Sequence, residues 1–329
     1  MQRPTVLHLI DDTTAGGVMR VLDHIRTAPA MATFADHHIQ PVQRNKITLP
    51  RLEADVIVSH LAISWRALPM LLALRLRHPK VSLVHVEHSY TEAFVALNVR
   101  KKGRFATLLR MAYGLFDRVV AVSEAQGKWL VNSGAVKARA LCVIRSCVDL
   151  SAFRGLAAPA PQVRVIGAIG RLDRQKGFDT LIEAFRQTRN PNVALHIYGE
   201  GEEGLALSAL AEGDPRIQFM GFVDPLVAMA NVDAVVMPSR WEAYGLVAIE
   251  ALAARRKLLV ADIDGLRDHI AYGAQAVQDQ SVAAWKNEIE NLLAQGPADT
   301  PASAARADSF EAEFAKSWQE MLAGLNTHR

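Results

Sequence analysis

Two carboxylates, Glu242 and Glu250, stand within the segment PSRWEAYGLVAIEALAARRK at residues 238–257. Gly245 opens a predicted helix over residues 246–254 whose faces are almost all apolar, so we expect the helix to be buried. Glu250 is the only ionisable side chain of this helix, and a buried carboxylate is costly unless hydrogen-bond donors reach it. The vicinal hydroxyls of a ribose are such donors, and an internal arginine or backbone group would serve equally well.

The start of the same helix has the chemistry of an anion site. The backbone N–H groups of Gly245, Leu246 and Val247 have no partner within the helix, and they point out of its positive end. Hydrogen bonds and the helix dipole would both favour a phosphate there. One short segment could therefore hold a sugar through Glu242, a diphosphate at the helix start and a ribose through Glu250.

A second segment, VRVIGAIGRLDRQKGFDTLIEAF at residues 163–185, predicts a strand, a basic loop and an amphipathic helix that starts near Gly177. Arg171 and Lys176 lie in the loop, at the carboxyl end of the strand. Ligands bind at this end of open α/β sheets. An arginine fork and a lysine ammonium would neutralise a pyrophosphate, although basic loop residues are often merely solvated.

The two segments together resemble the family 4 glycosyltransferases, which are retaining enzymes that use nucleotide sugars and have the GT-B fold. In the second half the resemblance is carried by GRLDRQKGFDTLIEAF, HIYGEGEE, MGFVD and PSRWEAYGLVAIEAL. In the first half it is carried by TTAGGVMRVL, AVSEAQGKWL and VIRSCVDLSAF. The resemblance therefore covers most of the chain, and it implies two facing Rossmann-like, doubly wound domains.

The resemblance also implies roles for particular residues. Arg171 and Lys176 would contact the donor diphosphate, Glu242 the hydroxyls of the transferred sugar, and Glu250 the ribose. His88, just after a strand of the first half, would reach the donor sugar, although a structural histidine is as consistent with the sequence. The remaining donor-site residues that the resemblance implies are Gly16, Gly17, Gly199, Gly245, Leu246, Phe222 and Val223; the Gly16–Gly17 loop would close over the phosphates, and the backbone at Phe222 and Val223 would meet the base.

The chain departs from the family pattern at several positions. Met19 stands where the family often has a glutamate, and Ser146 and Cys147 stand where it often has Asn-Gly. After the apolar helix, Arg255 and Lys257 replace the usual Gly and Pro, which costs about 1 kcal/mol if a left-handed glycine cap is lost. These departures leave the donor site intact and put the identity of the acceptor in doubt.

Length and hydrophobic periodicity predict two domains. A chain of 329 residues with half of them apolar can bury two cores. We expect an acceptor-binding domain at residues 1–154, a nucleotide-sugar-binding domain at 162–300, and a terminal helix at 305–329 that returns to the first domain. Short apolar runs alternate with helical patterns in both halves. The predicted strands are 6–10, 56–58, 81–86, 119–122 and 141–144, then 165–169, 194–198, 217–220, 234–237 and 258–261.

Charge divides the chain unevenly. Residues 1–150 contain 20 lysines and arginines against 11 acidic residues, whereas residues 151–329 contain 17 against 23. A basic half often binds an anionic partner. Residues 65–80 and 98–116 interleave basic and apolar side chains, so they could lie on an anionic membrane or be core-facing helices with solvated basic edges. Nucleic acid is a poorer partner, because only 6% of residues are aromatic and no known binding module appears.

Several features argue against other chemistry. Asp262 and Asp264 form a D-x-D triplet, but it follows a strand at a position where the family has small polar residues, so we expect no metal and no other cofactor. Cys142 and Cys147 are spaced neither as a zinc site nor as a redox pair, which is typical of a reducing compartment. The first residues read as a buried strand rather than a signal peptide. We expect a cytoplasmic protein, either free or peripheral on the cytoplasmic face of the inner membrane.

The combined prediction is a retaining glycosyltransferase that moves a sugar from a nucleotide-diphosphate sugar to a glycan or lipid-linked acceptor in cell-surface polysaccharide synthesis. Two alternatives stay open: a nucleotide-sugar epimerase on the same fold, and a non-catalytic subunit that binds a sugar nucleotide.

Overall fold

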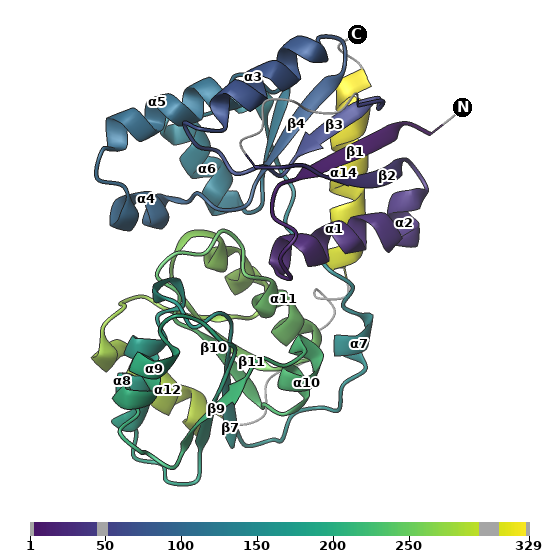
Figure 1. Cartoon of the computed structure of the whole chain (residues 1–329). Coiled ribbons are helices and arrows are strands. Elements are labelled where there is room, and N and C mark those ends of the chain that lie inside the picture. The colour runs from purple at the N-terminus through teal and green to yellow at the C-terminus, as the bar shows by residue number, and fades with distance from the viewer. Residues whose placement is uncertain (1–2, 45–51, 296–308, 327–329) are drawn as a thin grey trace. The chain divides into compact units, whose positions relative to one another are not determined.

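The computed structural model describes residues 3–44, 52–295 and 309–326. The chain divides into two compact units, one formed by Met1–Asp149 with Glu311–Arg329 and the other by Leu150–Phe310. Each unit contains a six-stranded parallel sheet with helices on both faces (Figure 1). This is the doubly wound α/β class that the sequence predicted.

The first unit has strand order β2-β1-β3-β4-β5-β6. In β1, Leu9 faces a core that includes Met70, Leu71 and Leu109, whereas His8 points to the opposite face. Strand alternation separates these two neighbours, because successive side chains of a strand point to opposite sides. The strands are β1 (Thr5–Ile10), β2 (Asp36–Pro41), β3 (Val56–Ser59), β4 (Ser82–Glu87), β5 (Arg118–Ala121) and β6 (Leu141–Val143), and the helices are α1 (Gly17–Thr27), α2 (Pro29–Ala32), α3 (Leu68–Arg77), α4 (Glu92–Asn98), α5 (Lys102–Tyr113), α6 (Glu124–Asn132), η1 (Ala138–Ala140) and α14 (Phe310–Asn326).

The last helix, α14, packs on the first unit beside α1 and β1 (Figure 1). Trp318 lies edge-on to His8, with ring centroids 5.7 Å apart, and Phe314 contacts His24 of α1. Its apolar stripe thus covers the face of the sheet opposite to α3 and α5. The outer parts of the expected terminal helix, 305–308 and 327–329, lie outside the described residues.

The second unit has strand order β12-β11-β10-β7-β8-β9. Taken from its own first strand, this order is that of dinucleotide-binding sheets, with the reversal of direction between β7 and β10. Helices α8, α9 and α12 cover one face and α7, α10 and α11 the other. The strands are β7 (Val165–Ile169), β8 (Ala194–Tyr198), β9 (Ile217–Gly221), β10 (Ala234–Met237), β11 (Lys257–Ala261) and β12 (Gln275–Val277), and the helices are α7 (Ser151–Arg154), η2 (Arg174–Lys176), α8 (Phe178–Arg186), α9 (Gly204–Leu210), α10 (Pro225–Ala230), α11 (Leu246–Ala253), η3 (Asp264–Tyr272) and α12 (Val282–Ala294).

The short helix α7 belongs to the second unit, although the expected boundary at residue 154 had placed it in the first. Two arginines that follow α11 hold it there. The guanidinium group of Arg255 donates to the carbonyl oxygens of Arg154 and Leu156, at 3.4 and 2.8 Å, and Arg256 donates to that of Ala157 at 2.9 Å. Arg255 adopts a left-handed φ of 58° at the helix end, where the family commonly has glycine, so these bonds offset the strain of a side chain in that conformation.

Candidate functional site

The two segments singled out in the second half meet at the point where the strand order of its sheet reverses. The loop after β7 carries Arg171 and Lys176, and the loop after β10 carries Glu242. Because β7 and β10 are parallel neighbours, both loops leave the same edge of the sheet. In open α/β sheets this crevice at the carboxyl ends of the strands is the usual ligand site.

Backbone contacts fix the two loops against each other. Gly177 has a left-handed φ of 66°, and a β-carbon on it would lie 2.2 Å from the carbonyl oxygen of Pro238, so no other residue fits there. The backbone N–H of Arg240 donates to the carbonyl of Gln175 at 2.7 Å, and the Gln175 amide donates to the carbonyl of Trp241 at 3.0 Å. The loops therefore form one rigid platform within this unit.

The ammonium group of Lys176 lies 2.5 Å from a carboxylate oxygen of Glu242. The two side chains are only 16% and 12% exposed. The aliphatic part of Lys176 passes close over Gly170, and the backbone of Glu242 is held by the side chain of Asp264 and by the N–H of Gly265. The structure thus brings together the two residues to which the resemblance assigns the diphosphate and the sugar.

Arg171 differs from Lys176 in being open to solvent. Its side chain is 75% exposed, with a loose ion pair to Asp173 at 3.2 Å. An exposed guanidinium at the mouth of a site remains available to a bidentate anion.

Helix α11 begins beside these loops and buries the second carboxylate. Gly245 is its N-cap, and Leu246 is its first residue. Glu250 has no solvent exposure and lies among buried alanine, isoleucine and leucine side chains of the same helix. The prediction of a buried helix around Glu250 is therefore confirmed, while its ribose-binding role stays a prediction.

The ends of β8 and β9 complete this edge of the sheet. A β-carbon on Gly199, whose φ is 136°, would lie 1.9 Å from the carbonyl oxygen of Gly170, so the two loops can approach this closely only because residue 199 is a glycine. Phe222 follows β9 and is 71% exposed, and Val223 beside it is half-buried. Phe222 is thus exposed where the resemblance places the base.

The aspartates of the D-x-D triplet already have protein partners. Asp262 accepts from the Arg267 guanidinium at 2.7 Å, and Asp264 accepts from the backbone N–H of Glu242 at 3.3 Å. Asp264 therefore supports the loop of Glu242 instead of pointing its charge toward solvent. Within the described residues, no cluster of three or more histidine, cysteine or acidic side chains could hold a metal ion.

In the first unit, Gly16 and Gly17 stand between β1 and α1. Gly16 is the extended N-cap residue of α1, and Gly17 is the first residue of the helix. Asp12 in the same loop accepts from the N–H of Thr14, and Arg44 pairs with both Asp11 and Asp12. The loop follows the carboxyl end of β1, and its expected closure over the donor phosphates stays a prediction.

His88 directly follows β4, and its position is set by the turn it begins. The buried carboxylate of Glu87 accepts from the N–H groups of Ser89 and Tyr90, at 2.7 and 2.9 Å, and from the hydroxyl of Tyr113 at 2.6 Å. Burial raises the pKa of Glu87, but the nearby ring of His85 and the hydrogen bond from Tyr113 outweigh this and hold that pKa below its ordinary value. Glu87 is thus a structural carboxylate that orders the loop around His88.

Three further histidines form a chain of ring contacts that begins at His88, and this link was not predicted from the sequence. Nε2 of His88 lies 2.8 Å from Nδ1 of His60, Nε2 of His60 lies 2.9 Å from Nδ1 of His8, and Nε2 of His8 lies 3.0 Å from Nδ1 of His37. The rings run His37, His8, His60, His88 in the order of the strands β2-β1-β3-β4. A signal did exist in the sequence, because His60 ends one buried apolar run as His88 ends the next.

All four rings are disfavoured as cations. Burial lowers the pKa of His88 to about 4, against the opposing charge of Glu87, and burial likewise lowers the pKa of His37 to about 4. Burial, with repulsion from the neighbouring rings, holds the pKa values of His8 and His60 well below their ordinary range. The chain of rings is therefore neutral at neutral pH.

The basic helices of the first unit divide into core and surface residues. Leu71, Leu108 and Leu109 are buried in the core, so these apolar positions of the two basic segments cannot meet a membrane. Other apolar side chains of this region are exposed. One of them is Trp65, and the guanidinium carbon of Arg104 lies 5.3 Å from the centroid of its ring. The exposed apolar side chains of α3, α4, α5 and the adjoining loop are Trp65, Leu72, Leu76, Leu97 and Met111. Within the described residues, no helix is both long and apolar enough to span a bilayer.

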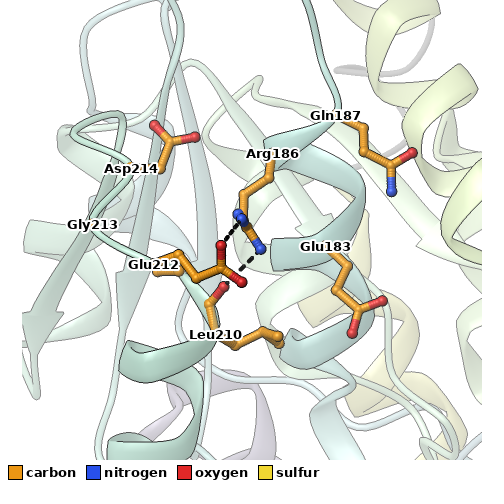
Figure 2. Close-up of a pocket in the computed structure, with 8 residues that line it drawn as sticks. Glu183, Arg186, Gln187, Leu210, Glu212, Gly213 and Asp214 are labelled. Atoms are coloured by element: carbon orange, nitrogen blue, oxygen red, sulfur yellow. Dashed lines mark hydrogen bonds and ion pairs between the residues drawn. The ribbon is translucent and has the colours of Figure 1, made fainter.

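A shallow hollow in the second unit lies at the opposite end of α8 from these loops. Figure 2 shows the Arg186 side chain bound to the carboxylate of Glu212 and to the carbonyl oxygen of Leu210. Glu183 and Gln187 line its other side (Figure 2). Its arginine is thus neutralised by the protein itself, and none of the residues implied in donor binding lines it.

Fold and site define a class: a chain of two doubly wound α/β units, one with a basic and acidic loop pair at the switch point of its sheet. Comparison with known families narrows this class. Residues 5–152 match the model described as "Glycosyltransferase Family 4", and residues 163–295 match "Glycosyl transferases group 1". The chain therefore belongs to the family 4 glycosyltransferases, a family of enzymes, and has the GT-B fold.

Individual relatives support this assignment. The chain is 32% identical over 200 residues to D-inositol 3-phosphate glycosyltransferase of Segniliparus rotundus, covering 54% of this chain and 44% of that protein. It is also 32% identical over 181 residues to glycogen synthase of Mycobacterium tuberculosis, covering 50% and 42%. The matches thus span less than half of the length of these curated relatives.

Solved structures resemble the whole chain in fold. Sucrose-phosphate synthase of Thermosynechococcus elongatus superposes with a TM-score of 0.75 at 20% identity, covering 99% of this chain and 100% of that one. HepE of Anabaena, solved with UDP and glucose, superposes with a TM-score of 0.72 at 17% identity, covering 97% and 99%. At such identities the likeness shows the fold alone.

Proposed function

We propose that the protein is a retaining glycosyltransferase that moves a sugar from a nucleotide-diphosphate sugar to a glycan or lipid-linked acceptor. The observation that carries the proposal is the pair of Lys176 and Glu242 on a rigid platform at the switch point, beside the start of α11. Family membership and a neighbour of the same fold that was solved with UDP and glucose support it. A role in cell-surface polysaccharide synthesis belongs to the same proposal.

In this proposal catalysis is mainly electrostatic. Negative charge builds on the leaving diphosphate as the bond to the sugar breaks. Arg171, Lys176 and the N–H groups at the start of α11 would stabilise that charge. The sugar would pass through an oxocarbenium-like state attacked on its front face, so Glu242 would hold sugar hydroxyls instead of acting as a nucleophile. His88 in the first unit would contact the same sugar.

We further propose that transfer needs no metal ion. The two cations of the loop after β7 would fill the role of a metal clamp. Asp262 and Asp264, the candidate metal ligands in the sequence, are engaged by Arg267 and by the backbone of Glu242. Turnover should therefore persist in EDTA. Loss of turnover in EDTA with recovery on adding a divalent ion would refute metal independence and bring Asp262 back as a ligand.

A peripheral position on an anionic membrane is the proposal for a lipid-linked acceptor. Its support is the exposed set at Trp65, Leu72, Leu76, Leu97 and Met111, which lies on and beside α3, α4 and α5. Three basic residues, Lys102, Arg104 and Arg110, also lie on α5, and residues 100 and 101 directly precede that helix. Each basic residue near anionic lipid contributes about 1 kcal/mol to the free energy of membrane binding, and salt screens this attraction. Binding to vesicles with anionic lipid should fall between low and physiological salt, and absence of binding at low salt would favour a soluble acceptor.

Product analysis tests the proposed function itself. The protein would be incubated with nucleotide sugars, with and without candidate acceptors, and the products separated. Transfer to an acceptor with the anomeric configuration retained supports the proposal. An altered nucleotide sugar formed without an acceptor would show an epimerase instead, and binding without any product would show a non-catalytic subunit.

A further inference from the structure

A chain of four hydrogen-bonded histidine rings crosses the sheet of the first unit and ends at His88. His37 lies on β2, His8 lies on β1, and His60 follows β3 directly. His8 is fully buried and His60 is 7% exposed. Every link joins an Nδ1 to an Nε2 at 2.8 to 3.0 Å, so each inner ring uses both nitrogens within the chain.

Such a chain has only two proton arrangements. A neutral imidazole donates from one nitrogen and accepts at the other, so one choice of direction sets every ring. In the first arrangement each ring donates from Nδ1, which leaves a lone pair on His37 Nε2 and a proton on His88 Nδ1. In the second arrangement each ring donates from Nε2, which leaves an N–H group on His37 Nε2 and a lone pair on His88 Nδ1.

The surroundings of His37 favour the first arrangement. Its Nε2 is buried and has no hydrogen-bond partner in the part of the chain that the structure describes. The same holds for Nε1 of Trp318, whose ring stands edge-on to His37 with centroids 6.4 Å apart. Indole nitrogen only donates, and orphaned buried N–H groups are rare. The second arrangement would add another orphaned donor beside it, whereas the first leaves an acceptor there.

Within the described residues, the charges that lower the pKa of His60 come from other histidines, namely His8, His85 and His88. His88 faces Glu87 and His85, and His37 faces Asp36 and His38. From α14 the neighbour is the uncharged ring of Trp318. Burial outweighs the two carboxylates, as the lowered pKa values of His88 and His37 show, so the rings act through their tautomers.

We propose that His60 is a positioning residue that fixes His88 as the neutral tautomer with its proton on Nδ1, so that His88 offers the donor sugar one N–H group and no positive charge. The inference rests on the proposed function, in which His88 contacts that sugar. His8 and His37 extend the same orientation from the sheet, and Trp318 covers its far end. A buried partner that sets the tautomer of a catalytic histidine is a known requirement in other enzymes, where the wrong tautomer lowers turnover by orders of magnitude.

The direct test is the side-chain nitrogen spectrum of the protein labelled with ¹⁵N-histidine, with His88 assigned from a His88→Gln variant. The expected spectrum shows His88 neutral with its proton on Nδ1. The variant His60→Phe keeps a ring but has no donor, so His88 should become a mixture of tautomers and kcat should fall at least about tenfold with little change in donor KM. His60→Asn places an amide donor where Nδ1 stood, and it should restore both the tautomer and most of the turnover.

The matched control is His38→Phe, on the exposed side of β2 next to His37, which should leave the spectrum of His88 and kcat unchanged. A proton on His88 Nε2 in the unchanged protein would overturn the proposal, whether or not any variant folds. So would a His60→Phe variant whose His88 tautomer is unaltered. If the protein shows no transfer with any nucleotide sugar, the proposed function fails, yet the spectrum of His88 still decides the tautomer.

Discussion

Lys176 and Glu242, 66 positions apart in the chain, form an ion pair of 2.5 Å between the loops that follow β7 and β10. Each side chain is mostly buried, so each neutralises the charge of the other. Without its partner, either charge would lie unpaired in a poorly polar environment. The pair therefore has two functions in this account. It joins the loops after β7 and β10, and it positions the two charged groups that would bind the donor.

This pairing predicts non-additive stability. Lys176→Ala and Glu242→Ala should each lower the free energy of unfolding by about 1–3 kcal/mol, because each leaves the remaining, partly buried charge without its partner. The double variant should lose clearly less than the two single losses combined. Denaturant unfolding of all four proteins measures the coupling, and strictly additive losses would show that the pair is not a functional unit of the fold.

The two carboxylates should affect binding and transfer differently. Glu250→Gln, in the buried helix α11, should weaken the binding of a free nucleoside diphosphate, because a ribose hydroxyl loses its charged acceptor. Glu242→Gln should leave that affinity nearly unchanged and lower kcat for sugar transfer. Calorimetric titration and turnover assays separate these effects. Equal losses of nucleotide affinity in the two variants would contradict the assigned division between ribose and sugar.

The left-handed backbone conformation at Arg255 predicts which of two substitutions gives the more stable protein. Arg255→Ala removes the hydrogen bonds to Arg154 and Leu156 and keeps a β-carbon at a φ of 58°. Arg255→Gly removes the same bonds and relieves the backbone strain, so it should be more stable than the alanine variant by about 1 kcal/mol. Thermal unfolding of the two variants gives the comparison. An alanine variant as stable as the glycine variant would mean that the left-handed conformation stores no strain.

The histidine chain predicts acid sensitivity of the first unit. The folded pKa values of His37 and His88 are about 4, below the ordinary value of 6.5, so the unfolded state binds more protons between these limits. Stability is therefore full above pH 6.5 and falls as pH decreases toward 4, by about 1.4 kcal/mol per pH unit for each such histidine. Denaturant unfolding across this range checks the slope. Replacing His37 by Phe should flatten it, whereas replacing the exposed His38 should not.

Much of the fold follows from local patterns. The ten predicted strands all form, because each is a short apolar run that the sheet buries. The two unpredicted strands, β2 and β12, are the outer strands of their sheets. Both strands are largely half-buried or exposed, and their sequences, DHHIQP and QAV, contain no apolar run that would reveal them.

The candidate site also has a part that the sequence predicted and a part that it did not. Motif spacing identified Lys176 and Glu242, but it did not predict their ion pair, because that contact depends on which loops become neighbours when the sheet forms. The link from His88 to His60 is likewise a property of strand order, not of sequence distance. Asp264 is a further case: its D-x-D pattern was discounted as a metal site, but the sequence did not predict that its side chain holds the backbone of Glu242.

The most direct test of the central claim, that the loops after β7 and β10 form a nucleotide-sugar site, compares two arginines of the second unit. Nucleoside diphosphates and nucleotide sugars would be titrated against the unchanged protein, Arg171→Ala and Arg186→Ala. Arg171 is exposed beside the platform, whereas Arg186 lies at the far end of α8 in a pair with Glu212. At least one ligand should bind and raise Tm, with Arg171→Ala weakening it at least about tenfold and Arg186→Ala leaving Kd unchanged. Failure of every nucleotide to bind, or equal losses in both variants, would contradict the account.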